Sequence, residues 1–195
     1  GQGGYAADPK AVIRTVPCAA GGLKSFSVVA AELATGREIT PERFTESGEA
    51  GPEAWIDYPG PPGSVLTVPF SRVIEGKFKP GTFKDRVVVV GATNETLQDS
   101  HPTSTTGKDL MPGPEIQAAS VDTILRDLPL QSAPGWVKVL LVSAMAVVMP
   151  LLATAVRFGY ALGIAVVLSI VYPFLAKFAF DAGTIIPVAV PLFGL

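Results

Sequence analysis

Three apolar stretches dominate the last third of the sequence. Residues 136–156 and 159–179 each contain a single charged residue, near one end. As helices rising about 1.5 Å per residue, each would measure roughly 31 Å, the thickness of a bilayer's hydrocarbon core. The third stretch, 184–195, would cover only about 18 Å as a helix. The pattern therefore predicts an α-helical transmembrane region at 136–195 with three spans, the third truncated.

An alternative explanation is that these stretches are buried helices of a globular core. Such a helix normally keeps one polar face for the solvent, and neither of the two long stretches offers one. Their composition therefore favours lipid as the surrounding medium.

Apolar residues at helical spacing mark two helices in the more polar part of the chain. In residues 25–33, apolar side chains recur three and four positions apart, and a Thr-Gly pair follows. In residues 114–127 a proline stands first, Glu115 complements the positive end of the helix dipole, and Ile116 and Ile124 lie on one face. Both segments therefore have the start and stop signals of ordinary helices.

Residues 86–90, with the sequence RVVVV, are the clearest predicted strand. Four consecutive β-branched residues without polar alternation are typical of a central parallel strand that is buried on both faces. A polar loop, 91–113, and then the helix at 114–127 follow it. This order predicts an α/β domain in residues 1–135, with a buried, mostly parallel sheet flanked by helices. The sequence starts without methionine, and we expect the domain itself to begin before residue 1.

Charge is distributed unevenly and excludes one class of partner. Of 15 Lys+Arg and 17 Asp+Glu residues, 12 and 16 respectively lie in residues 1–135, which leaves that part at −4. The whole chain has a net charge of −2. Nucleic-acid binding needs a basic surface, so we expect no nucleic-acid partner.

The loop 91–113 holds most of the candidate binding residues. It leaves the C-terminal end of the predicted strand, where ligands tend to bind in open α/β sheets. The candidates for a ligand-sensing loop are Thr93, Asp99, His101 and Thr103, together with Glu115 from the following helix. The alternative is a loop folded on itself, with Asp99 accepting hydrogen bonds from backbone amides. The residues alone leave both interpretations open.

Catalytic, cofactor and metal motifs are missing from the sequence. The segment after the strand, GATNET, is not a G-x-G-x-x-G fingerprint, and TGKD lacks the rest of a P-loop. Asp99, Ser100 and His101 are consecutive and cannot form a catalytic relay. A single histidine cannot build a His-rich metal site, and Cys18 has no partner for a disulfide. We therefore predict no catalytic residue, cofactor or metal ligand.

Three sequence blocks carry a resemblance to a known family. They are WIDYPGPPGSVLTVPFSRVIEG, FKDRVVVVGATNETLQDSHPTS and MPGPEIQAASVDTILRDLPL, followed by the apolar stretches. In this order they resemble the CHASE2 domain, over nearly the whole chain and most clearly over 55–130. Two departures stand out. Gln117 occupies the usual histidine position, and Pro114 replaces the usual valine. The family's Thr-Pro step is here Pro-Thr-Ser.

The resemblance implies an extracytoplasmic sensor domain of a bacterial receptor in the inner membrane, a multi-pass protein with residues 1–135 outside the cytoplasm. The implied partners are the lipid bilayer, an unknown small-molecule or envelope signal, a cytoplasmic effector in cis and a second copy of the chain. The effector of such receptors is commonly a class III adenylate/guanylate cyclase. We expect the segment itself not to be an enzyme.

Other functions remain alternatives. In the first alternative, the effector on the same polypeptide is a histidine kinase, a serine/threonine kinase or a diguanylate cyclase instead of a class III cyclase. Residues 1–135 would otherwise be a membrane-tethered hydrolase, for which no nucleophile–base pair is found, or a module that only mediates assembly.

Overall fold

The chain forms two compact units, Gly1–Pro129 and Leu130–Leu195. The computed structural model describes residues 6–7, 12–44, 46–48, 51–93, 99–155 and 158–186.

A four-stranded sheet forms the centre of the first unit. Its strands are β1 (Ala6–Ala7), β2 (Ile13–Pro17), β6 (Gly51–Trp55) and β5 (Glu46–Gly48), in that spatial order. Every neighbouring pair in it is antiparallel. The expected buried and mostly parallel sheet is therefore wrong. Strand β5 ends at Gly48 and β6 begins at Gly51, and so short a connection can join only antiparallel strands.

Two short strand pairs accompany this sheet. Strands β3 (Ala19–Ala20) and β4 (Leu23–Lys24) form a tight hairpin. Strands β7 (Ser100–His101) and β8 (Met111–Pro112) pair across the loop that contains the candidate residues.

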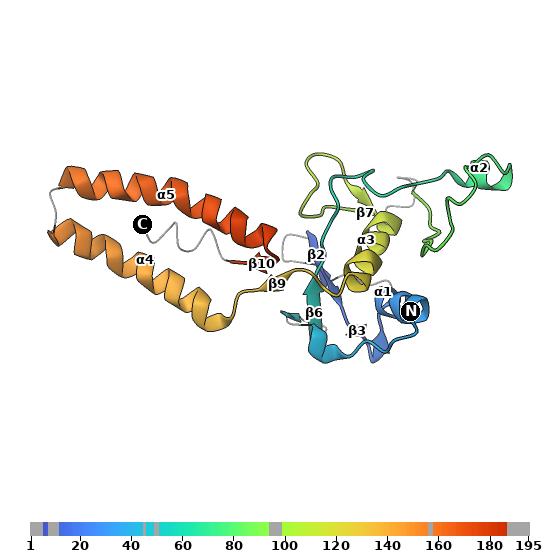
Figure 1. The fold of residues 1–195 in the computed structure, drawn as a ribbon, viewed down its shortest axis with the longest axis horizontal. Coiled ribbons are helices and arrows are strands. Elements are labelled where there is room, and N and C mark those ends of the chain that lie inside the picture. The colour runs from blue at the N-terminus through green and yellow to red at the C-terminus, as the bar shows by residue number, and fades with distance from the viewer. Residues whose placement is uncertain are drawn as a thin grey trace. The chain divides into compact units, whose positions relative to one another are not determined.

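Helices α1 (Phe26–Thr35) and α3 (Gly113–Leu125) pack against each other, as Figure 1 shows. The Ser25 hydroxyl accepts a hydrogen bond from the Val28 amide at the start of α1, and Gly36 ends the helix with a φ of 67°. Both helices lie where the apolar spacing predicts them, within two residues. Two shorter helices are η1 (Pro41–Arg43) and α2 (Phe70–Ile74).

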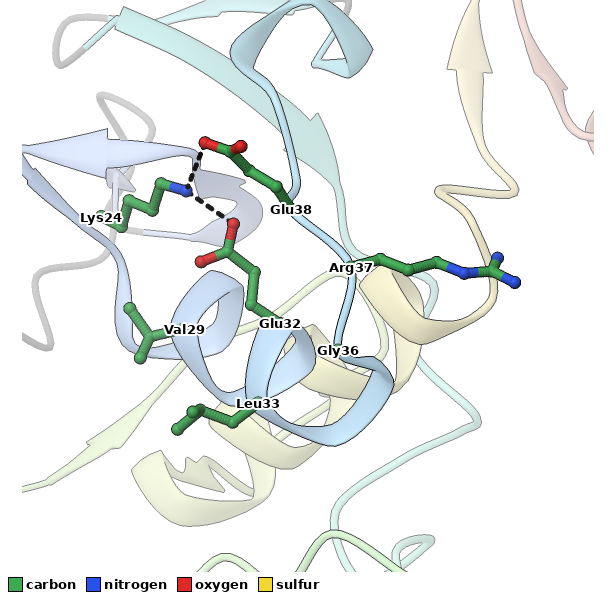
Figure 2. A pocket seen from close by; sticks show the side chains of 7 residues that line it. All are labelled: Lys24, Val29, Glu32, Leu33, Gly36, Arg37 and Glu38. Atoms are coloured by element: carbon green, nitrogen blue, oxygen red, sulfur yellow. Dashed lines mark hydrogen bonds and ion pairs between the residues drawn. The ribbon is translucent and has the colours of Figure 1, made fainter.

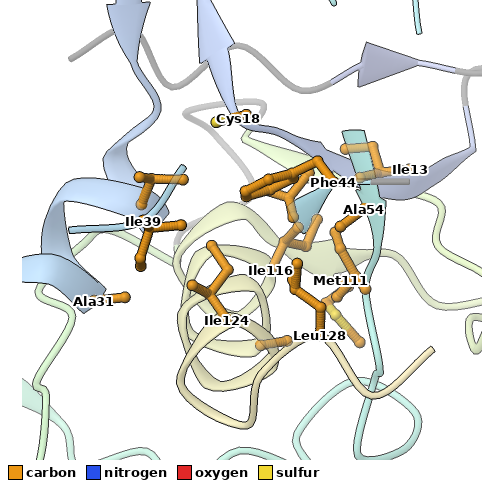
Figure 3. Close-up of a cluster of buried hydrophobic side chains, with 14 residues drawn as sticks. Ile13, Cys18, Ala31, Ile39, Phe44, Ala54, Met111, Ile116, Ile124 and Leu128 are labelled. Atoms are coloured by element: carbon orange, nitrogen blue, oxygen red, sulfur yellow. The ribbon is translucent and has the colours of Figure 1, made fainter. Parts of the chain in front are cut away.

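The core of the first unit lies between these two helices and the sheet (Figure 3). Val28 of α1 and Ile116 of α3 are completely buried, and Met111 is 1% exposed. Ala54 and Ile56 belong to the same cluster. Because side chains alternate along a strand, Glu53 and Trp55 of β6 project from the opposite face of the sheet.

Residues 86–90 are not a strand, which corrects the clearest strand prediction. Val87, Val88 and Val90 are 40%, 50% and 79% exposed. A β-branched run becomes a central strand only if neighbouring strands pair with it. Strands β2 and β6 hold the two central positions of the sheet, and none of the described strands pairs with residues 86–90.

The second unit is a helical hairpin with a short strand pair. Helices α4 (Gly135–Ala155) and α5 (Phe158–Asp181) follow one another and make only a few contacts with each other in the described residues, and α5 contains Pro173. Strands β9 (Gln131–Ser132) and β10 (Thr184–Ile185) pair in parallel.

The expected three membrane spans at 136–195 are wrong as a description of this fold. None of the helices that the structure describes combines the length and the apolarity needed to cross a bilayer. Residues 184–185, expected at the start of the third span, form β10 instead. The rest of that expected span, from residue 187, lies outside the described residues.

Candidate functional site at the N-terminus of α3

Three segments that are distant in the sequence meet at the first turn of α3. The strand pair β7–β8 brings Asp99 to Gly113, and the Asp99 carbonyl accepts a hydrogen bond of 2.8 Å from the Gly113 amide. Gly91 lies so close to Pro114 that a Cβ added to it would overlap the proline ring. The third segment, residues 63–65, is held by Glu115. We name this meeting point the α3 junction.

Gly113 allows the Asp99 carboxylate to approach the start of α3 closely. A Cβ at position 113 would overlap both carboxylate oxygens of Asp99. The carboxylate thus lies beside the N-terminus of a 13-residue helix, where the helix dipole stabilises a negative charge. The alternative interpretation expects the Asp99 side chain to accept hydrogen bonds from backbone amides. The bond from the Gly113 amide goes to the backbone carbonyl of Asp99.

His101 forms the second polar group of the α3 junction. Its Nε2 lies 3.2 Å from Asp99 Oδ1, and the two side chains are 36% and 50% exposed. They therefore form a solvent-accessible pair of an imidazole ring and a carboxylate, which suits the binding of a polar ligand.

Thr103 and Thr93 lie apart from this pair. Thr103 is 4% exposed and belongs to a local turn, in which the Thr106 hydroxyl accepts from the Thr103 amide at 2.8 Å. A single parallel bridge joins it to Ile13 of β2. Thr93 is exposed. Of the five predicted residues, the structure thus brings together Asp99, His101 and Glu115 around one helix terminus.

The Glu115 carboxylate binds the chain's own backbone. It is 9% exposed, and its oxygens accept hydrogen bonds of 3.0 Å from the Gly63 amide and of 3.1 Å from the Val65 amide. Glu115 therefore anchors the Gly-Pro-rich loop after β6 and has a positioning role.

Replacing Glu115 with alanine should lower the free energy of unfolding by about 2 kcal/mol, because hydrogen bonds to a charged acceptor are lost at a buried site. Urea unfolding followed by circular dichroism measures the change. Glu115→Gln, which keeps one side-chain oxygen, should lose about half as much. An alanine variant as stable as the unmodified chain would show that the carboxylate does not hold the loop.

Gln117 links the two core helices. Its Oε1 accepts a hydrogen bond of 2.9 Å from the Ser27 hydroxyl of α1. Thr123 makes a comparable link, since its hydroxyl accepts from the Asp57 amide at 3.0 Å and donates to the Ala119 carbonyl at 2.7 Å. These bonds hold α3 to α1 and to the segment after β6.

A shallow, open hollow of about 450 Å³ at α1 was not predicted from the sequence (Figure 2). In this hollow, Lys24 Nζ lies 2.6 Å from Glu32 Oε1 and 3.7 Å from Glu38 Oε1. The bond to Glu32 raises the pKa of Lys24. The Ile39 amide and Lys24 together lower the pKa of Glu32. The charges are thus used within the fold and leave little for a ligand.

Cys18 and the acidic residues offer no obvious chemistry. Burial raises the pKa of the Cys18 thiol, which disfavours the nucleophilic thiolate. Within the part of the chain that the structure describes, no three His, Cys, Asp or Glu residues are grouped for metal binding.

Comparison with known proteins identifies one family. The model of the CHASE2 domain matches residues 4–153. No curated protein and no solved structure matches the chain. The family match covers well over half of the sequence and includes the α3 junction, so the chain belongs to the CHASE2 domain family.

Proposed function

We propose that the chain is the input module of a bacterial signalling receptor and that it receives its signal at the α3 junction. The observation that carries the proposal is the match to the CHASE2 domain over residues 4–153. A CHASE2 domain is an extracytoplasmic sensory module and has no catalytic role.

The geometry of the α3 junction supports a sensory role for its polar pair. Asp99 and His101 are partly exposed, and a ladder of only two residue pairs, β7–β8, holds them in place. A ligand that binds the imidazole or displaces the carboxylate would act directly on Gly113. The signal would be polar or charged, since these two groups recognise it.

Helix α3 is suited to carry such a change away from the junction. Its buried face, with Ile116 and Ile124, belongs to the core, and packed cores shift between discrete arrangements more readily than they deform. A displacement of the first turn would therefore repack the core between α3 and α1. A ligand shifts this equilibrium only by its difference in affinity for the two arrangements.

The proposal includes an effector on the same polypeptide, a class III adenylate/guanylate cyclase, and a receptor that works as a homodimer. The family's membership in signalling receptors supports the effector in cis. In a symmetric dimer, a small shift in each protomer would repack the surface between the copies.

Cyclic nucleotide output of the receptor that carries this chain tests the proposal. The receptor is expressed in cells without their own adenylate cyclase, and cyclic AMP and cyclic GMP are measured. Asp99→Asn and His101→Ala should each change basal output several-fold, because both break the pair at the α3 junction. Asp109→Asn makes the same chemical change at an exposed loop position and should leave output unchanged.

Two results would contradict the proposal separately. A receptor that produces neither cyclic nucleotide does not have a cyclase effector. Equal output from Asp99→Asn, His101→Ala and Asp109→Asn, in a receptor that does produce the nucleotide, shows that the α3 junction does not receive the signal.

A further inference from the structure

The outer face of helix α1 is apolar and exposed. Val28 and Ala31 of this helix are completely buried in the core. The side of α1 that faces away from the core presents Phe26, Val29 and Leu33, at spacings of three and four residues. Their side chains are 40%, 39% and 82% exposed. We name these three residues the outer stripe of α1.

Helix α1 offers almost no charge to the solvent. Glu32 is its only charged residue, and the fold already uses that carboxylate. Glu32 Oε1 accepts hydrogen bonds of 2.6 Å from Lys24 Nζ and of 2.7 Å from the Ile39 amide. A surface helix normally turns charged and polar side chains to the solvent, and an apolar face is normally covered. The outer stripe therefore has the composition of a surface that a partner covers.

The surroundings of the outer stripe are self-complementary. Figure 2 shows Val29 and Leu33 on the same side of α1, beside the hollow that both residues help to line. A two-fold dimer uses the same patch on both subunits, so a projecting side chain and a hollow on one patch can fill each other. The charged side chains that line the hollow, two of each sign, are Lys24, Arg37, Glu32 and Glu38. Because these charges balance, the patch suits a second copy better than a partner with an excess of one sign.

We propose that the outer stripe of α1 binds the outer stripe of a second copy of the chain, with the two helices antiparallel across a two-fold axis. This inference rests on the proposed homodimer and names the surface through which the copies meet. An antiparallel pair places opposite ends of the two helix dipoles side by side, which is favourable. Val29 then meets its own counterpart near the axis, and Phe26 meets Leu33.

The charges at the two ends of α1 select this direction. Lys24 precedes the helix and Glu38 follows it, so the antiparallel arrangement brings Lys24 of one copy near Glu38 of the other. Within one copy the two charged groups are 3.7 Å apart, and the Glu38 side chain is 80% exposed, so its carboxylate is accessible to a second copy. A parallel arrangement would place like charges beside each other at both ends, which is unfavourable.

The size of the outer stripe determines the strength of association. A standard interface buries about 800 Å² on each partner, more than three apolar side chains and their charged neighbours provide. We therefore expect weak association, as in transient signalling contacts. Disulfide trapping suits such a contact, because it accumulates a complex that is populated only part of the time.

Disulfide formation in the whole chain tests the surface directly. Under mild oxidation, Val29→Cys should form an intermolecular disulfide at least ten-fold faster than Val87→Cys. Two thiols beside the axis fall within the Cα separation of about 4.4–6.8 Å that a disulfide needs. Val87 is the matched control, since it is 40% exposed and lies outside α1. The unmodified chain, whose Cys18 is buried, should form no disulfide.

Mixed disulfides test the direction of the helices. When Phe26→Cys and Leu33→Cys chains are combined, one of them carrying a mass tag, the mixed disulfide should exceed either homodisulfide several-fold. The reason is that only the antiparallel arrangement brings these two positions together.

A charge reversal tests the contact between the helix ends. Glu38→Lys, introduced into the Val29→Cys chain, should slow disulfide formation several-fold, because the new positive charge would face Lys24 of the second copy. Glu75→Lys makes the same change outside α1 and should leave the rate unaltered.

The proposal is overturned if Val29→Cys and Val87→Cys form disulfides at equal rates while circular dichroism shows that both variants are folded. Homodisulfides as abundant as the mixed one would overturn the antiparallel arrangement. If Val29→Cys does not fold, the mixture of Phe26→Cys and Leu33→Cys decides the question.

Failure of this surface and failure of the proposed function are distinguishable. A chain that is dimeric in sedimentation experiments but forms no Val29→Cys disulfide keeps the proposed homodimer and loses this surface. Cyclic nucleotide output that does not respond to substitution of Asp99 or His101 removes the sensory role of the α3 junction and leaves the disulfide results unaffected.

Discussion

Ile116→Ala should lower the free energy of unfolding of the first unit by about 3–4 kcal/mol, the largest effect that we expect from a single side chain. Ile116 is completely buried and lies in the core cluster with Met111 and Ala54. Truncation removes three methyl or methylene groups from a packed environment and leaves a cavity that the surrounding sheet and helices fill only partly. Urea unfolding followed by circular dichroism measures the loss.

Ile74→Ala is the matched control for this experiment. Ile74 lies in α2 and is 73% exposed, so the same chemical change should alter stability by no more than about 0.5 kcal/mol. Losses of similar size in the two variants would mean that the packing of α3 against the sheet does not stabilise the first unit.

Gly113→Ala should destabilise the first unit by about 1 kcal/mol, because Asp99 must give up its position beside the helix, while the better helix propensity of alanine offsets part of this loss. The added methyl group would overlap the Asp99 carboxylate, which the β7–β8 pair holds against the helix. The half-exposed Asp99 side chain must rotate away from the helix and from His101 to relieve this overlap. The free energy of unfolding again gives the measurement.

Removal of the Asp99 carboxylate should rescue this variant. In the double variant Asp99→Ala with Gly113→Ala, the overlapping atoms are gone and the helix propensity of alanine remains. We expect a coupling of about 0.5–1 kcal/mol between the two positions, at the lower end of the range found for residues in contact. Additive effects would contradict the contact between Asp99 and Gly113.

Local signals in the sequence predict the two core helices well. A serine at the N-cap and a glycine after the last turn mark α1, and a proline and Glu115 mark the first turn of α3. These signals act through backbone groups within a few residues. They hold whatever the rest of the chain does, so the predicted limits differ from the structure by at most two residues.

The candidate site shows the limit of such local reasoning. The sequence predicts Thr93, Asp99, His101, Thr103 and Glu115 as candidate binding residues, because polar residues follow an apolar run and precede a helix. It does not show that the Glu115 carboxylate binds Gly63 and Val65, which lie about fifty residues earlier. The position of Glu46 opposite Glu53 across β5 and β6 is equally invisible, because it depends on the register of two strands.

The positions of α1 and α3, the net charge and the family are therefore determined by the order of residues alone. Three features depend on which segments pair and pack. They are the antiparallel direction of the strands in the sheet, the exposure of residues 86–90, and the secondary structure of residues expected to span a membrane at 136–195. An apolar or β-branched run specifies only that its side chains favour burial or an extended backbone. Its neighbours come from distant parts of the chain, so only the folded molecule decides whether β2 pairs with that run or with β1 and β6.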